Sequence, residues 1–250
     1  MAGVEKETRP ASAGLRLLTL TGAVAICAPA TANAAAWIAP IDGQQIFTST
    51  YGNREGLRYS ETSGYLEAPV TKNDSVVIAP WLIQDYIDDN GWRAEATAGV
   101  KHVITHTDHT VAAVQVSALW VSSPPAHCDE GGAELRVLGG VNLPHNTFVN
   151  AELAERVLSG GCSDQRAEFT GGMHLGRHWM GLAQVFVDGP QYGDETVKAQ
   201  LSLVHFDNHH RGIQIGIRDR IDGGEDELAV VVGFWTEPRR ARDRRRHRAD

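Results

Sequence analysis

The sequence predicts one all-β domain, a single up-and-down antiparallel β-barrel of 12 strands, with 10 strands as the alternative. Two observations predict this fold. Apolar and polar side chains alternate with a period of two along most of the chain, and short segments rich in Gly, Asp and Asn separate the alternating runs. The clearest example is the hairpin from Arg211 to Trp235, in which Ile213, Ile215 and Ile217 share one face of the first strand. No helical period extends beyond two turns.

The alternation places the expected strands in order along the chain. The stretch from 52 to 73 is the least legible, and whether residues 57–67 form a strand decides between the two strand counts. Pro80 lies in the middle of the next strand and predicts a bulge or kink there, because proline cannot donate to a sheet ladder. The expected strands are residues 44–51, 57–67, 74–86, 92–101, 111–122, 134–142, 149–156, 166–174, 179–187, 196–206, 211–220 and 228–235.

The two ends of the chain differ from this β domain. Residues 1–34 resemble a cleaved signal peptide: Arg16 precedes the apolar run 17–28, and residues 32–34 have the small-x-small form of a cleavage site. A first core helix is the alternative. Residues 238–250 hold seven Arg and two Asp, a run of like charge that predicts a disordered tail. The expected barrel domain is therefore residues 35–237.

The charge distribution argues against nucleic acid as a partner. The chain carries a formal charge of −8, and because the tail contributes +5, residues 1–237 carry −13. A nucleic-acid-binding domain presents a basic folded surface, whereas this body is acidic. The basic tail suits contact with anionic lipid headgroups instead.

The connections between strands fall into two alternating sets. One set is longer, Gly-rich and acidic, and holds Cys128 and Cys162 in consecutive loops. An even pair of cysteines in an exported protein predicts a disulfide, with two free thiols as the alternative. The other set is short and carries His106, His109, His145, His178, His209 and His210. In a meander every second connection lies on the same rim, so the sequence predicts an acidic rim and a histidine rim.

The placement of charges indicates which face of the barrel points inward. The polar faces carry full charges of both signs in mid-strand, as expected for pairs across a wet or filled lumen. The apolar faces carry mostly Ala, Val, Leu and Ile, with Trp92, Trp120 and Trp179 near strand ends, as in the aromatic belts of membrane barrels. The apolar face is therefore expected to face lipid. The expected lumen charges are Arg93, Glu95, Lys101, Glu134, Arg136, Glu152, Arg156, Arg166, Glu168, Lys198, Arg218 and Arg220.

With its signal, alternating strands and last strand ending in Phe234-Trp235, the chain resembles bacterial outer-membrane β-barrels. It is most similar to uncharacterised proteobacterial barrels of this length, some loosely grouped with aromatic-degradation transporters. The resemblance implies a porin-like transmembrane protein in the cell outer membrane, in contact with lipid and lipopolysaccharide. It also implies recognition of the terminal aromatic by the barrel-insertion machinery. One departure is that residues 236–250 follow that aromatic residue.

The expected function is a small channel or a structural membrane protein. No Gly-x-Ser-x-Gly motif is present, and Ser117 and Ser202 have no His at strand-neighbour spacing, so no catalytic residues and no enzyme activity are predicted. We expect the acidic and histidine side chains of the two rims to be solvated rather than to bind metal, and no cofactor is predicted. Two alternatives stay open: an outer-membrane lipid or lipopolysaccharide hydrolase, and a secreted soluble β-barrel that binds a small apolar ligand.

Overall fold

The computed structural model describes residue 39 and residues 43–54, 56–85, 91–125, 127–191, 193–208, 211–224 and 226–236. The predicted signal peptide, the Arg-rich tail, His209 and His210 lie outside the described residues. No helix among the described residues is long and apolar enough to cross a membrane.

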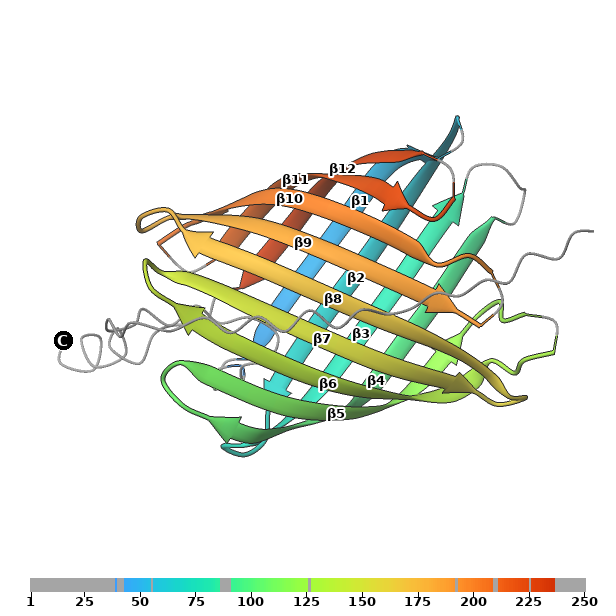
Figure 1. The fold of residues 1–250 in the computed structure, drawn as a ribbon, viewed down its shortest axis with the longest axis horizontal. Coiled ribbons are helices and arrows are strands. Elements are labelled where there is room, and N and C mark those ends of the chain that lie inside the picture. Colours follow the sequence, from blue (N-terminus) through green and yellow to red (C-terminus); the bar gives the residue numbers. More distant parts are fainter. Residues whose placement is uncertain are drawn as a thin grey trace, which may run out of the picture.

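Twelve strands form one closed barrel in which each strand pairs antiparallel with its neighbours in sequence, and β1 pairs with β12 (Figure 1). The 12-strand prediction is confirmed, because the doubtful segment forms β2. The strands are β1 (Gln44–Arg54), β2 (Leu57–Pro69), β3 (Asp74–Asp85), β4 (Trp92–His106), β5 (Thr110–Val121), β6 (Gly131–Leu143), β7 (Thr147–Leu158), β8 (Cys162–His174), β9 (Trp179–Pro190), β10 (Thr196–Phe206), β11 (Arg211–Asp222) and β12 (Glu227–Thr236).

The connections divide between two rims. We call the end that carries the β1–β2, β3–β4, β5–β6, β7–β8, β9–β10 and β11–β12 connections the loop rim, and the other end the turn rim. β1 begins and β12 ends at the turn rim. The acidic and histidine sets fall on the loop rim and the turn rim respectively, as predicted. The greater length of the loop-rim set comes mainly from residues 86–91 and 122–130.

The outer wall is largely apolar, with polar residues such as Gln45, Arg58 and Thr62 on β1 and β2. Ile213, Ile215 and Ile217 are 59%, 62% and 57% exposed, whereas Arg218 on the same strand is 7% exposed and faces inward. Trp92 and Trp120 near the loop rim and Trp179 near the turn rim also face outward. A barrel that exposes this much large apolar surface is stable in lipid rather than in water. The soluble barrel with an apolar interior along these strands is therefore not the arrangement present.

The bulge predicted at Pro80 is absent. β2 and β3 keep one register on both sides of it, from Ser63 opposite Trp81 to Leu66 opposite Ile78. Gly64 stands opposite Pro80, and a Cβ on Gly64 would lie 3.0 Å from Pro80 Cγ. The sheet therefore makes room for the proline ring with a glycine on the neighbouring strand instead of an extra residue. Register shifts occur elsewhere, in the β4–β5 and β10–β11 ladders.

Candidate functional site in the barrel lumen

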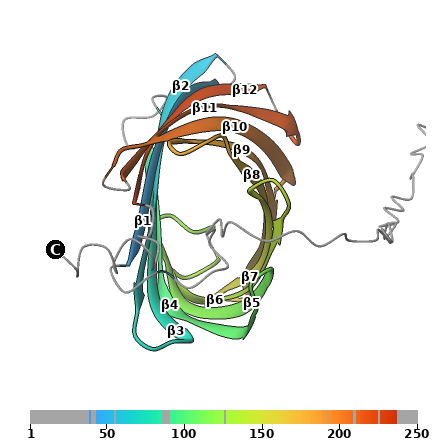
Figure 2. The same cartoon turned by 90° about the vertical axis from the view of Figure 1, so that its left-hand side faces the viewer.

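The lumen has two compartments of different chemistry along its axis. The half near the loop rim holds two networks of ion pairs, and we call it the charged compartment. The end near the turn rim holds packed apolar side chains, which we call the apolar layer. Seen along the barrel, the wall is oval, with β10–β12 and β4–β7 at its opposite ends (Figure 2). One ion-pair network comes from β1, β2 and β10–β12, and the other from β4 and β6–β9.

The first network, the cationic wall, is centred on the fully buried carboxylate of Glu227 at the start of β12. Tyr59 Oη donates to Glu227 Oε1 at 2.6 Å, and Arg54 Nε and Arg220 Nη2 lie 3.0 and 2.9 Å from Oε2. Lys198 Nζ lies 3.7 Å from the same oxygen. One carboxylate thus joins side chains of five strands, and the pairs fix the loop-side ends of β1, β2 and β10–β12 to each other.

Arg218 extends the cationic wall toward the middle of the barrel. Its guanidinium binds Glu61 on β2 in a bidentate pair, with both N···O distances at 2.9 Å, and its Nε lies 3.7 Å from Glu227 Oε1. Fork-shaped pairs of this kind are the strongest that arginine makes with a carboxylate. The members of this wall are four cations, Arg54, Lys198, Arg218 and Arg220, and two carboxylates, Glu61 and Glu227.

The second network, the acidic wall, has the opposite balance. Arg156 reaches Glu95 at 2.7 Å and Asp164 at 2.9 Å, and Arg166 reaches Glu95 at 3.0 Å. Deeper in the lumen, Arg136 contacts Glu134 at 3.0 Å and Glu152 at 2.7 Å. The members are three arginines, Arg136, Arg156 and Arg166, and six carboxylates, Glu95, Glu134, Glu152, Asp164, Glu168 and Asp188.

A third polar cluster lies on β2 and β4. Glu67 Oε2 accepts from Lys101 Nζ and from Tyr65 Oη, both at 2.7 Å, and the Lys101 and Glu67 side chains are fully buried. The backbone N–H of Ala39 donates to Glu67 Oε1 at 3.2 Å, and Ala39 is 3% exposed. Glu67 pairs in register with Gln44, the first residue of β1, so this cluster lies toward the turn rim.

A row of neutral polar side chains crosses the inner wall from β8 to β12. Gln184 Nε2 donates to Glu168 at 3.1 Å, and Gln200 Nε2 donates to Gln184 Oε1 at 2.9 Å. Ser202 Oγ accepts from Gln200 and from Gln214, whose Oε1 accepts from Trp235 Nε1 at 2.6 Å. The hydroxyl of Ser202 is therefore held by amide groups rather than by a general base.

The apolar layer lies toward the turn-rim end of the lumen and comes from β4–β7, β9 and β10. Two of its aromatic rings lie over glycines of the next strand: a Cβ on Gly172 would meet the Phe148 ring, and a Cβ on Gly212 would lie 2.7 Å from Phe206 Cε1. The glycines let the rings lie against the wall. The layer consists of Val103, Val111, Ala113, Leu138, Phe148, Met180, Leu182, Val204 and Phe206, each at most 4% exposed, with Trp235 packed against it.

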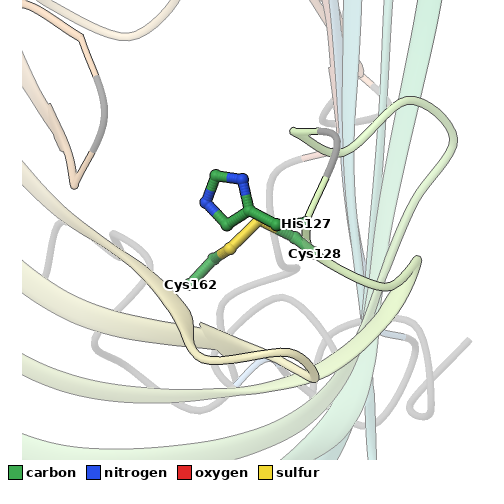
Figure 3. A group of neighbouring side chains, drawn as sticks. All are labelled: His127, Cys128 and Cys162. Atoms are coloured by element: carbon green, nitrogen blue, oxygen red, sulfur yellow. A yellow bond between two sulfur atoms is a disulfide. The ribbon is translucent and has the colours of Figure 1, made fainter.

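A disulfide joins Cys128 in the β5–β6 loop to Cys162 at the start of β8, with a Cα–Cα distance of 5.9 Å, as the sequence predicts (Figure 3). His127 lies beside it, and the candidate ligand atoms of the three residues lie within 4.8 Å of one another. Metal binding by cysteine requires the thiolate, so the oxidised pair holds no metal through its sulfurs. On the turn rim, the described histidines His106, His109 and His145 are exposed.

The structure brings most of the sequence-predicted lumen charges into these networks. Lys101, Lys198, Arg218 and Arg220 join clusters with β1, β2 and β12, whereas Arg93 lies exposed at the loop rim. The other seven predicted charges lie in the acidic wall. Sequence reasoning missed Arg54, Glu61, Glu67, Asp164, Asp188 and Glu227, and it missed the apolar layer.

Comparison with known proteins finds similarity in fold but no similarity in sequence. No family model matches the sequence, and no curated protein matches it. Among solved structures, NanC porin superposes with a TM-score of 0.58 at 10% identity, covering 76% of this chain and 99% of that chain. The fold is shared with outer-membrane porins. KdgM porin gives a TM-score of 0.55 at 5% identity, covering 78% of this chain and 98% of that chain. An outer-membrane channel from Pseudomonas putida F1 gives 0.54 at 10% identity, covering 83% and 99%.

Proposed function

We propose that this protein is an outer-membrane channel of the porin type that passes small polar or charged solutes and is closed in the state described. The observation that carries the proposal is the pairing of a largely apolar outer wall around a closed 12-strand barrel with a charged compartment that begins at the loop rim. The start of β1 and the end of β12 share the turn rim, so this rim faces the periplasm in the arrangement usual for such barrels.

The balance of charge in the lumen supports a polar rather than an apolar cargo. Arg166 and Asp188, near the loop rim, have side chains 35% and 42% exposed, so solutes from the loop side meet ionic groups first. The apolar layer at the turn-rim end then acts as the barrier, because a narrow apolar constriction excludes water and therefore blocks ions. Passage therefore requires the layer to open or to repack.

A non-catalytic role fits the environment of the two serines considered from the sequence. Ser202 Oγ accepts from two glutamine amides, and Ser117 Oγ accepts from Gln115 Nε2 at 3.0 Å. An acyl hydrolase needs a base within hydrogen-bond reach of its nucleophile. We expect a covalent serine probe to leave the purified protein unlabelled, and labelling at Ser117 or Ser202 would support the hydrolase instead.

The experiment that tests the channel is single-channel recording of refolded protein in a planar bilayer. We expect discrete openings from a mostly closed baseline. The matched control is protein refolded under the same conditions and then unfolded by heat. This sample should migrate at a different rate from the folded protein on electrophoresis and should give no openings. The absence of openings from folded protein, identified by a change in electrophoretic mobility on heating, would reject the channel and favour a structural barrel.

A further inference from the structure

Two carboxylates face each other directly on neighbouring strands of the acidic wall. Glu152 on β7 is the register partner of Glu168 on β8, and both point into the lumen. Like charges directly opposite each other in an antiparallel pair destabilise it. Something else must therefore offset the repulsion at this pair.

The two carboxylates have unequal contacts. Arg136 Nη1 lies 2.7 Å from Glu152 Oε2, while its Nε binds Glu134. Glu168 Oε1 accepts from Thr170 Oγ1 at 3.0 Å and from Gln184 Nε2 at 3.1 Å, both neutral donors. Among the described residues, Arg136 is thus shared between Glu152 of this pair and Glu134, whereas the hydrogen bonds of Glu168 come from neutral donors.

A nearby cation does not remove this excess. Lys101 interacts electrostatically with Glu152 across the lumen, but its ammonium lies 2.7 Å from Glu67. Arg156 also contacts Glu134, at 3.5 Å, but it is shared with Glu95 and Asp164. The three cations Lys101, Arg136 and Arg156 are therefore outnumbered by the carboxylates they contact together with Glu168. The local balance is negative, in a place where apolar neighbours strengthen every electrostatic interaction.

An independent observation points to the same place. Asn150 is the next inward-facing residue of β7 before Glu152, and it stands opposite Thr170 in the β7–β8 register. Asn150 is 4% exposed, and its Oδ1 has no hydrogen-bond partner among the described residues. Buried polar oxygens without a donor are rare in native structures and are commonly satisfied by a bound water or ion. The site therefore offers an amide oxygen in addition to the carboxylates.

We propose that Glu152, Glu168 and Asn150 form a binding site for a small monovalent cation, either an alkali metal ion or the ammonium group of a solute. One carboxylate of the facing pair is already matched by Arg136, so a single positive charge restores balance. Carboxylate and amide oxygens are ligands suited to hard cations and to N–H donors alike. This inference deepens the proposed channel function, because it makes the passage prefer cations, but the site itself does not depend on conduction.

The site lies where the charged compartment meets the apolar layer. Phe148 of the apolar layer is the inward-facing residue of β7 next to Asn150, on the turn-rim side. On the other side Arg136 is 24% exposed, which leaves a route from the loop rim. A cation arriving from that rim thus reaches the last anionic position before the apolar layer.

The conductance test uses a substitution that keeps shape and removes charge. We expect Glu168→Gln to lower the potassium-to-chloride permeability ratio, read from reversal potentials across a KCl gradient, by about threefold to tenfold. The matched control is Glu155→Gln, on the neighbouring strand β7 and exposed on the outer wall, which should leave the ratio unchanged. Equal permeability ratios for wild type and Glu168→Gln would overturn the cation site without rejecting the channel function.

A second readout does not require current to flow. Folded protein in detergent should unfold at a higher temperature in KCl than in N-methylglucamine chloride of equal ionic strength, because a ligand that binds only the folded state stabilises it. Glu168→Gln should lose this difference, and the isosteric Asn150→Asp should enlarge it by adding a carboxylate. A wild-type midpoint that is the same in KCl, methylammonium chloride and N-methylglucamine chloride would overturn the proposal. A response to methylammonium alone would assign the site to the ammonium group of a solute, and a response to potassium alone to a metal ion.

Discussion

On the loop side the lumen holds two networks of ion pairs, whereas on the turn side β4–β7, β9 and β10 contribute a layer of packed apolar side chains. Glu227 draws cations from β1, β10 and β11 to a fully buried carboxylate, and its geometry allows little variation. In the apolar layer, Phe148 and its neighbours pack without direction, so one side chain substitutes for another with little loss of specificity. The charged compartment therefore fixes how distant strands close into a barrel, and the apolar layer determines whether the lumen is sealed.

The largest expected effect comes from breaking the charged compartment at its centre. Glu227→Gln removes the fully buried carboxylate that Arg54, Arg220 and Lys198 share. Removing one partner of a buried ionic cluster costs about 3–5 kcal/mol, because the remaining charges stay desolvated. Urea unfolding of the variant in lipid vesicles should show this loss.

The control for that measurement is Asp219→Asn. Asp219 lies on β11 between Arg218 and Arg220 but is exposed on the outer face of the strand. Its substitution should change the free energy of unfolding by at most about 0.5 kcal/mol. Equal losses for the two variants would show that burial of the Glu227 cluster contributes nothing particular to closure of the barrel.

The difference between the compartments also explains what could be predicted from the sequence. On β11, Ile213 and Gln214 differ sharply in polarity, so the period-two pattern was sufficient to fix the strand and its orientation. On β2 both faces are polar: Tyr59 and Glu61 face inward while Arg58 and Thr62 face outward. No contrast between faces remained there, so the strand stayed doubtful and its inward carboxylates were missed.

The apolar layer was missed for the opposite reason. Val111 and Phe148 are apolar on the inward face, where the prediction expected polar groups, so their positions looked like gaps in the alternation. The ion-pair partners were beyond sequence reasoning for a geometric reason. Arg156 binds Glu95 from 61 positions away. That pairing depends on the stagger of a closed barrel, which a period-two pattern does not contain.

The next largest effect tests which compartment seals the lumen. Phe148→Ala removes an aromatic ring from the apolar layer, where Phe148 is 2% exposed. We expect a loss of about 3 kcal/mol in the free energy of unfolding, together with more frequent or larger openings in bilayer recordings. The control Val149→Ala removes apolar volume from the adjacent outward-facing residue and should leave conductance unchanged. Openings that increase with Glu227→Gln but not with Phe148→Ala would place the seal in the charged compartment instead.

The smallest expected effect concerns the fit between Phe148 and the wall. A Cβ at Gly172 would lie 2.2 Å from the Phe148 ring, so Gly172→Ala forces the ring to move into a lumen that is already filled. Overpacking of this kind costs about 1–3 kcal/mol. The same substitution made together with Phe148→Leu should cost less, because the smaller side chain leaves room for the added methyl group. A double-mutant cycle should therefore give a coupling energy of about 1 kcal/mol. Additive effects would mean that Gly172 acts through its own backbone rather than as the surface on which Phe148 packs.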